Sequence, residues 1–275
     1  MMNQVATIDQ SEVNALLAEL GGGADSEQDT IKIPFLKVQY EPEDKQDRPV
    51  PRGHFFLQGE DDPVYAKSVK VHVMAQYYQY REQNPDTYKI VNKTILLDDI
   101  RKNREARDML GGFMCGRPDA KTLKMLEPDE QKMWRKKVKA TRILRGVTSY
   151  IGKTANGEEK VVENQPFQLY LTGSNFLTFD KVLEALPFGK KFQDVWTDLD
   201  TRKEGKAFIN QFAIDFSSPA VLTPEVVETM KVFVDMARQE NSRIEQSFAK
   251  HQMQDANTSA VYDAISHDLD SDLED

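Results

Sequence analysis

Cysteine is almost absent from this sequence, since Cys115 is the only one among 275 residues. No disulfide can therefore form within the chain, and nothing indicates an oxidising compartment. Long apolar runs are absent too, because no stretch approaches the roughly 20 residues that a membrane helix needs. Residues 1–9 contain neither a basic residue nor an apolar run, which is not the pattern of a secretory signal. We expect a cytoplasmic protein without a membrane partner.

Residues that carry catalysis or bind metals are also scarce. The sequence has four histidines, and none is spaced from another or from Cys115 as metal ligands are. A Gly-rich phosphate loop, an HExxH motif and a GxSxG motif are all missing. Asp98 and Asp99 could hold Mg²⁺ in a nuclease, but adjacent side chains on a helix point apart. We expect a protein that is not an enzyme, with no cofactor and no metal.

Basic residues are missing from both ends of the chain. Residues 1–30 contain six acids and no Lys or Arg, and the residues after Lys250 contain seven acids and no Lys or Arg. Removing these thirteen acids from the formal net charge of −9 leaves +4 for residues 31–250. Residues 132–153 contain eight basic residues and no acid. A basic centre between acidic ends is typical of a protein that binds a polyanion and carries an acidic tail.

Periodicity divides the chain into three parts. Residues 1–30 are predicted to form an acidic helix and a Gly-rich linker, residues 31–252 a core with a C-terminal helix, and residues 253–275 a disordered acidic tail. Alternating strands and hairpin turns in the core predict an α+β protein with an OB-like small antiparallel β-barrel, peripheral helices and disordered acidic termini. Strand counting alone does not separate an OB-like barrel from other small barrels.

Two predicted strands carry the candidate binding residues. In residues 64–81, period-2 alternation turns Val69, Val71, Val73, Ala75 and Tyr77 towards the core and leaves Lys70, Tyr78 and Tyr80 on the other face. Residues 135–151 form a basic strand with Trp134 and Tyr150 at its ends. Cations in a row suit phosphates, and exposed rings suit stacked bases. The predicted nucleic-acid-binding residues are Lys70, Tyr78, Tyr80, Trp134, Arg135, Lys137, Lys139, Arg142, Arg145 and Tyr150.

The same residues also fit a structural interpretation. A run of charge is often a solvated face, and Trp134 and Tyr150 could belong to the core. We assign to the core the side chains of Phe55, Phe56, Phe167, Tyr170 and the phenylalanines of residues 208–216.

Three functions are compatible with the composition of the acidic tail. It could fold back onto the basic groove as a mimic of nucleic acid, dock onto a protein partner, or serve only to keep the chain in solution. The predicted partner-binding residues are Asp268, Leu269, Asp270, Asp272, Leu273, Glu274 and Asp275.

This arrangement resembles the single-stranded DNA-binding proteins of tailed bacteriophages. The matching segments are residues 31–39 (IKIPFLKVQ), 53–57, 64–80, 134–150, 167–172 and the acidic tail. The resemblance implies an OB-type core that binds single-stranded DNA with little sequence preference during phage DNA replication or recombination, in the cytoplasm of the host cell. It also implies that replication or recombination proteins contact the tail, and it leaves homo-oligomers open.

One feature departs from that family. Its tails often end in a bulky aromatic residue, whereas this chain ends in Leu273, Glu274 and Asp275. The alternative function is a phage protein-interaction factor, such as a host-defence inhibitor or an assembly protein, that does not bind nucleic acid.

Overall fold

A computed structural model describes residues 33–221 and 223–271, and the side chains among them except those of residues 103, 218 and 255–271. It confirms the α+β prediction, with an eight-stranded mixed sheet and, in the described chain, four α-helices. The predicted helix and linker of residues 1–30 lie outside this part. None of its helices has the length and apolar composition needed to cross a membrane.

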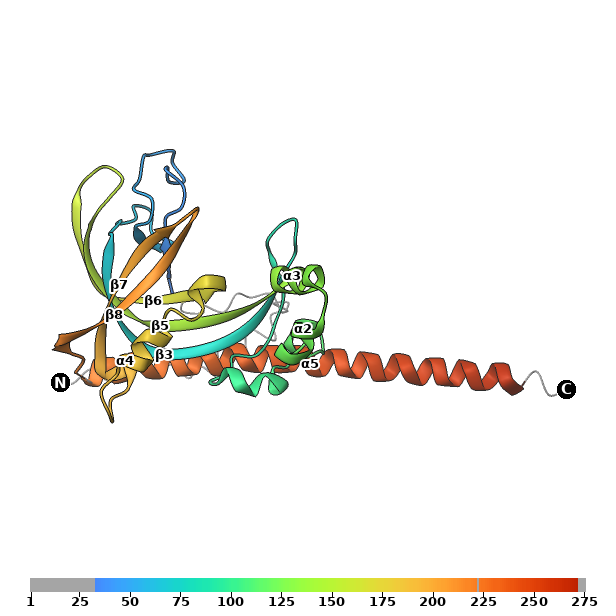
Figure 1. Ribbon diagram of the computed structural model, residues 1–275. Coiled ribbons are helices and arrows are strands. Elements are labelled where there is room, and N and C mark those ends of the chain that lie inside the picture. Colours follow the sequence, from blue (N-terminus) through green and yellow to red (C-terminus); the bar gives the residue numbers. More distant parts are fainter. Residues whose placement is uncertain (1–32, 222, 272–275) are drawn as a thin grey trace, which may run out of the picture. The chain divides into compact units, whose positions relative to one another are not determined.

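The strands are β1 (Phe35–Val38), β2 (Phe55–Gln58), β3 (Ser68–Gln83), β4 (Ile90–Lys93), β5 (Val138–Lys153), β6 (Glu159–Thr172), β7 (Val195–Glu204) and β8 (Ala207–Pro219). The α-helices are α2 (Ala120–Met125), α3 (Pro128–Lys137), α4 (Asp180–Ala185) and α5 (Pro224–Ser271). Short 3₁₀ turns are η1 (Ile100–Glu105), η2 (Met114–Gly116), η3 (Gly173–Asn175) and η4 (Phe192–Asp194). The long strands β3 and β5 run side by side, with α5 passing below them in the view of Figure 1.

The sheet is open, where the sequence predicted a small antiparallel barrel. Its strand order is β2-β1-β6-β5-β3-β7-β8 with β4 on β3, and in the described chain no ladder between β2 and β8 closes it. The pair β1–β6 is parallel. Counting strands could not show this, because the count reports neither strand length nor pairing. A single bridge between Phe55 and Ala66, with backbone hydrogen bonds of 2.7 and 3.0 Å, brings β2 back against the start of β3.

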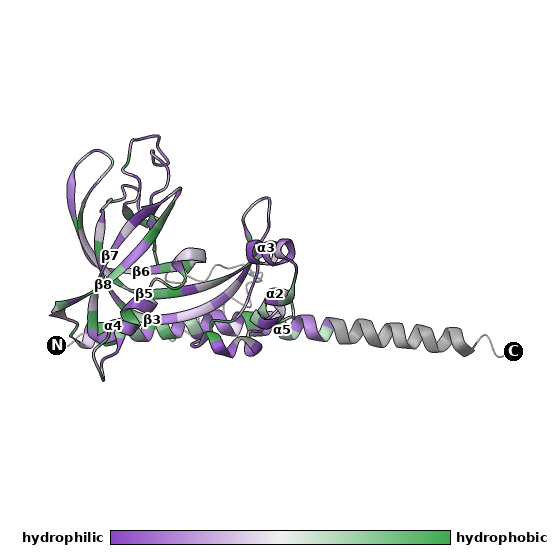
Figure 2. Ribbon diagram, viewed as in Figure 1, coloured by the Kyte–Doolittle hydropathy of each residue, from purple (hydrophilic) through white to green (hydrophobic). Residues whose placement is uncertain are grey.

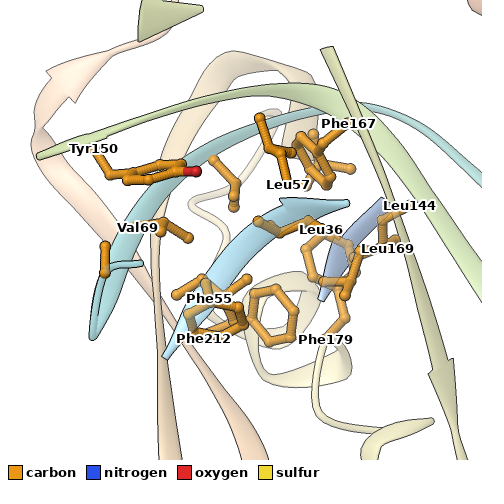
Figure 3. Packing of buried hydrophobic residues seen from close by; sticks show 14 of the residues in the cluster. Leu36, Phe55, Leu57, Val69, Leu144, Tyr150, Phe167, Leu169, Phe179 and Phe212 are labelled. Carbon is orange, nitrogen blue, oxygen red and sulfur yellow. The ribbon is translucent and has the colours of Figure 1, made fainter. Parts of the chain in front are cut away.

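The main hydrophobic core draws on seven strands of this sheet and on α4. Phe55 and Phe167 are fully buried there, as predicted, and Phe212 is also in the core. Tyr170 is half-buried and packs against a smaller buried cluster, whereas Phe216 is 70% exposed, so the core prediction was wrong for Phe216. Figure 3 labels the cluster members Leu36, Phe55, Leu57, Val69, Leu144, Tyr150, Phe167, Leu169, Phe179 and Phe212.

Strand β3 exchanges its two faces halfway along its length. Val69, Val71 and Val73 point into the main core, as the alternation predicts. The register with β5 then shifts between Val73 and Ala75, so that Met74 is an extra residue. One inserted residue moves all later side chains to the opposite face. The second half of β3 therefore has the inverse of the predicted alternation.

Helix α3 occupies the start of the segment that the sequence predicted as a basic strand. Pro128 stands in its first turn, Asp129 and Glu130 follow, and the last turn carries Arg135, Lys136 and Lys137. Acids near the N-terminus and cations near the C-terminus both favour a helix through its dipole. The basic run therefore ends a helix, and the strand begins only at Val138. Figure 2 shows α3 as largely hydrophilic.

Polar side chains fasten α5 to the sheet. Asn241 accepts a hydrogen bond from the Leu96 backbone nitrogen at 2.6 Å and donates one to the Leu96 carbonyl at 3.0 Å. Glu240 forms ion pairs with Lys93 at 2.8 Å and with Arg145 at 3.2 Å. These contacts place the middle of α5 against the β3–β4–β5 part of the sheet. The helix continues to Ser271, past the predicted end at Gln252.

Candidate nucleic-acid interface

Three of the predicted stacking residues are buried. Tyr78 and Tyr80 are 6% exposed, because the bulge at Met74 turns them into a second hydrophobic cluster. Tyr150 belongs to the main core, where its hydroxyl donates to the Val64 carbonyl at 3.3 Å. Burial raises the pKa of Tyr150 well above its ordinary value. These rings offer no face to a base, so their assignment to the interface was wrong.

Two of the predicted cations are buried in ion pairs. Arg142 is 3% exposed and contacts Asp180 at 2.5 Å, with its guanidinium 5.3 Å from the centre of the Tyr78 ring. Arg145 is also 3% exposed and binds Glu240. A charge taken out of water needs such partners. Both arginines therefore hold the fold together and are not available to phosphates.

Lys70 remains on the surface, but its charge is compensated. Its ammonium lies 2.5 Å from the Asp215 carboxylate. The hydrogen bond from Lys70 to Asp215 raises the pKa of Lys70, although partial burial opposes the shift. Asp198 is its direct neighbour on β7. Two acids beside one cation make this part of β3 a poor phosphate site.

The remaining predicted residues lie where α3 leads into β5. Trp134 is half-buried against the second cluster, with the Lys137 ammonium 5.2 Å from its ring centre. Lys137 also pairs with Glu82 at 3.2 Å. Arg135 is exposed on α3, and Lys139 is half-buried on β5. The structure therefore leaves Arg135 and Lys139 as predicted cations without an ion pair in the described chain.

Lys139 belongs to a row of three cations that sequence reasoning missed. On the β3–β5 ladder Lys139 is the direct partner of Arg81, and on the β3–β4 ladder Arg81 is the direct partner of Lys93. Side chains of direct antiparallel partners share a face and lie about 5 Å apart. Like charges at that spacing repel, and among the described residues only Lys93 of the three has an acidic partner, Glu240. The row is suited to an incoming anion.

Aromatic rings continue this row across the same face. The Arg81 guanidinium lies 4.6 Å from the centre of the Tyr170 ring on β6. Tyr170 meets Phe35 of β1 edge to face at 5.0 Å, and the Lys37 ammonium lies 5.7 Å from the Phe35 ring centre. We call the six residues Lys93, Arg81, Lys139, Tyr170, Phe35 and Lys37 the cation–aromatic strip.

A pocket of about 510 Å³ opens at this strip. The side chains around it include three aromatic rings, two cations and two amides, and none of the residues lining it is acidic. Burial raises the pKa of Tyr170, and Arg81 opposes this in part, so the ring is a neutral phenol near pH 7. These lining residues are Phe35, Tyr40, Tyr170, Lys37, Arg81, Asn175 and Asn210. We call this space the Arg81 pocket.

The acidic side chains of the predicted tail lie outside the described residues. Asp272, Leu273, Glu274 and Asp275 lie outside the described residues, as do the side chains of Asp268, Leu269 and Asp270. Within the described part of the chain, no group of three or more His, Cys, Asp or Glu side chains could hold a metal ion.

Comparison with models of protein families, with curated proteins and with solved structures finds no match for this chain.

Proposed function

We propose that this protein binds single-stranded DNA with little overall sequence preference, during phage DNA replication or recombination. The observation that carries the proposal is the row of cations Lys93, Arg81 and Lys139, which continues into the rings of Tyr170 and Phe35. Phosphates neutralise a row of cations, and base faces stack on rings at about 1–3 kcal/mol each. The strip combines both requirements on one face of the sheet.

The rings favour single strands over duplex. Tyr170 and Phe35 are half-buried in the sheet, so only a base that leaves its own stack can reach their faces. In a duplex those faces are covered by neighbouring base pairs, and only the phosphates remain accessible. We therefore expect duplex DNA to use the cations alone.

We also propose that five strands of the sheet correspond to the five-stranded sheet of an OB-type protein. The five strands β1, β2, β3, β5 and β6 are consecutive in the sheet and all contribute to the main core, and the bridge between Phe55 and Ala66 joins the two ends of that group. In OB-type proteins a curled five-stranded sheet carries a single strand on its surface. The bridge between Phe55 and Ala66 supports this correspondence, because it joins β2 to the residues just before β3, and these are the outer strands of the five.

Cations of the neighbouring helices extend the strip. Arg135 and Lys136 are exposed on α3, and Lys121 and Lys124 on α2. A strand that leaves Lys139 towards α3 would meet these charges next. The acidic tail, with Asp268, Asp270 and Asp272 among its acids, is proposed to compete for the same cations or to contact replication proteins.

Fluorescence anisotropy with oligo-dT and with a duplex of equal length, at two salt concentrations, tests the proposal. We expect tighter binding of the single strand and a log–log salt slope of about −2 to −3.5, as three to five phosphate contacts would give. No binding of oligo-dT at low salt would reject the proposal and favour the protein-interaction alternative.

A further inference from the structure

Asn210 of β8 has a buried amide that the fold leaves unsatisfied. Its side chain is 5% exposed, and its Oδ1 is shielded from solvent and accepts no hydrogen bond within the described chain. The backbone nitrogen of Asn210 donates to Asn175 Oδ1 at 2.7 Å, so the strand itself is well bonded. A buried acceptor without a donor destabilises a fold. An apolar side chain of the same size would suit this position better if only packing mattered.

A second unsatisfied group lines the same pocket. Arg81 Nε is also shielded from solvent and has no acceptor among the described residues. Both side chains line the Arg81 pocket, together with the rings of Phe35, Tyr40 and Tyr170. The residues that line the pocket therefore carry one unused acceptor and one unused donor, both shielded from solvent in this structure, together with three aromatic rings.

A nucleobase can satisfy both unused atoms, whereas a phosphate can satisfy only the donor. The sugar-phosphate chain of DNA presents acceptors alone, which Arg81 could bind but Asn210 Oδ1 could not. Every base presents an N–H donor beside a ring nitrogen or carbonyl acceptor on one edge, and two flat faces. We infer that the Arg81 pocket holds one unpaired base: the side chains of Asn210 and Arg81 turn towards it, so that the base N–H donates to Asn210 Oδ1 and Arg81 Nε donates to the base acceptor. This inference rests on the proposed single-strand binding.

The fold supplies a matched control for Asn210. Asn92 of β4 is 4% exposed, its Oδ1 is likewise buried without a donor in the described part of the chain, and it does not line the pocket. Asn210→Leu and Asn92→Leu therefore make the same chemical change at equally buried positions. Because each removes an unsatisfied polar group, neither should lower the melting temperature by more than a few degrees. Only Asn210→Leu should affect binding.

The test compares oligo-dT of about 16 nucleotides with an abasic oligomer of the same length and charge, using fluorescence anisotropy. The wild type should bind oligo-dT at least tenfold more tightly than the abasic chain. Asn210→Leu should lose about five- to tenfold in affinity for oligo-dT and nothing for the abasic chain. Asn92→Leu should match the wild type on both.

The outcomes separate the inference from the proposed function. If the wild type binds neither oligomer at low salt, single-strand binding itself is wrong. If it binds both equally, or if Asn210→Leu and Asn92→Leu both bind oligo-dT as the wild type does, the strand is held by its phosphates and the base pocket is rejected. Should Asn210→Leu fail to fold, Asn210→Ser, which keeps a polar group but shortens it, must show the same selective loss.

Discussion

Arg81 and Lys139 are direct partners on the ladder between β3 and β5, and neither takes part in an ion pair in the described chain. Direct cross-strand pairs of like charge destabilise a sheet, by up to about 1 kcal/mol. The contact of Arg81 with the Tyr170 ring offsets part of that cost. The pair is thus a local weakness of the fold, and an anion bound between the two cations would relieve it.

Tyr170→Leu should separate stacking from charge. Removing the ring should weaken oligo-dT binding by about 1–3 kcal/mol and leave the salt slope unchanged, because no phosphate contact is lost. Tyr170→Phe keeps the ring face and should bind nearly as the wild type does. Anisotropy at several salt concentrations provides both numbers. Equal losses for the two variants would mean that the hydroxyl matters and that the ring does not stack.

Glu240 should make the stability of the protein depend on pH in the acid range. Burial alone would raise the pKa of Glu240, but Lys93, by attraction and a hydrogen bond, and Arg145 lower it below the ordinary 4.5. A carboxylate with a depressed pKa stabilises the fold fully above the ordinary value, and this contribution is lost as the pH falls through the lowered one. The wild type should therefore lose stability below about pH 4.5.

Glu240→Gln should remove that dependence. Near pH 7 the free energy of unfolding of the variant should be about 3 kcal/mol lower than that of the wild type, because the buried Arg145 would lose its partner. The difference between the two proteins should shrink as the pH falls, since the wild-type carboxylate becomes protonated. Denaturant titrations at several pH values measure this. A difference that stays constant down to pH 3 would show that Glu240 acts through packing and not through charge.

Truncation after Gln254 should tighten oligo-dT binding at low salt. The removed segment contains seven acids and no Lys or Arg, and it would compete with DNA for the cations of the strip. At high salt the two forms should converge, because screening weakens both attractions. Unchanged affinity at low salt would exclude competition and leave contact with a protein partner as the role of the tail.

Sequence patterns predicted local features well. The alternation of Val69, Val71 and Val73 identified the core face of β3, and the charge distribution led to Lys139. The bulge at Met74 could not be foreseen, because nothing in its side chain marks an extra residue. That single residue moved Tyr78 and Tyr80 from the surface into the interior.

The candidate site was harder to predict because it depends on pairing between distant strands. Arg81, Lys93 and Lys139 become neighbours only through the registers of two ladders. Tyr170 was assigned to the core because aromatic residues in strands usually pack there. Asn210 gave no signal, since an unsatisfied amide is visible only once its surroundings are known.

The double variant Arg81→Gln/Lys139→Gln tests most directly whether DNA binds at the cation–aromatic strip, through the salt slope of its oligo-dT binding. Its control is Lys203→Gln/Lys206→Gln, which removes the same charge from two exposed lysines at the β7–β8 hairpin, outside the pocket lining. We predict that the first variant lowers the magnitude of the slope by about 1.4, because the terminal guanidinium nitrogens of Arg81 and the ammonium of Lys139 each lose a phosphate contact, and that the control leaves it unchanged. Equal effects of the two variants, or no effect of either, would contradict a binding site at the cation–aromatic strip.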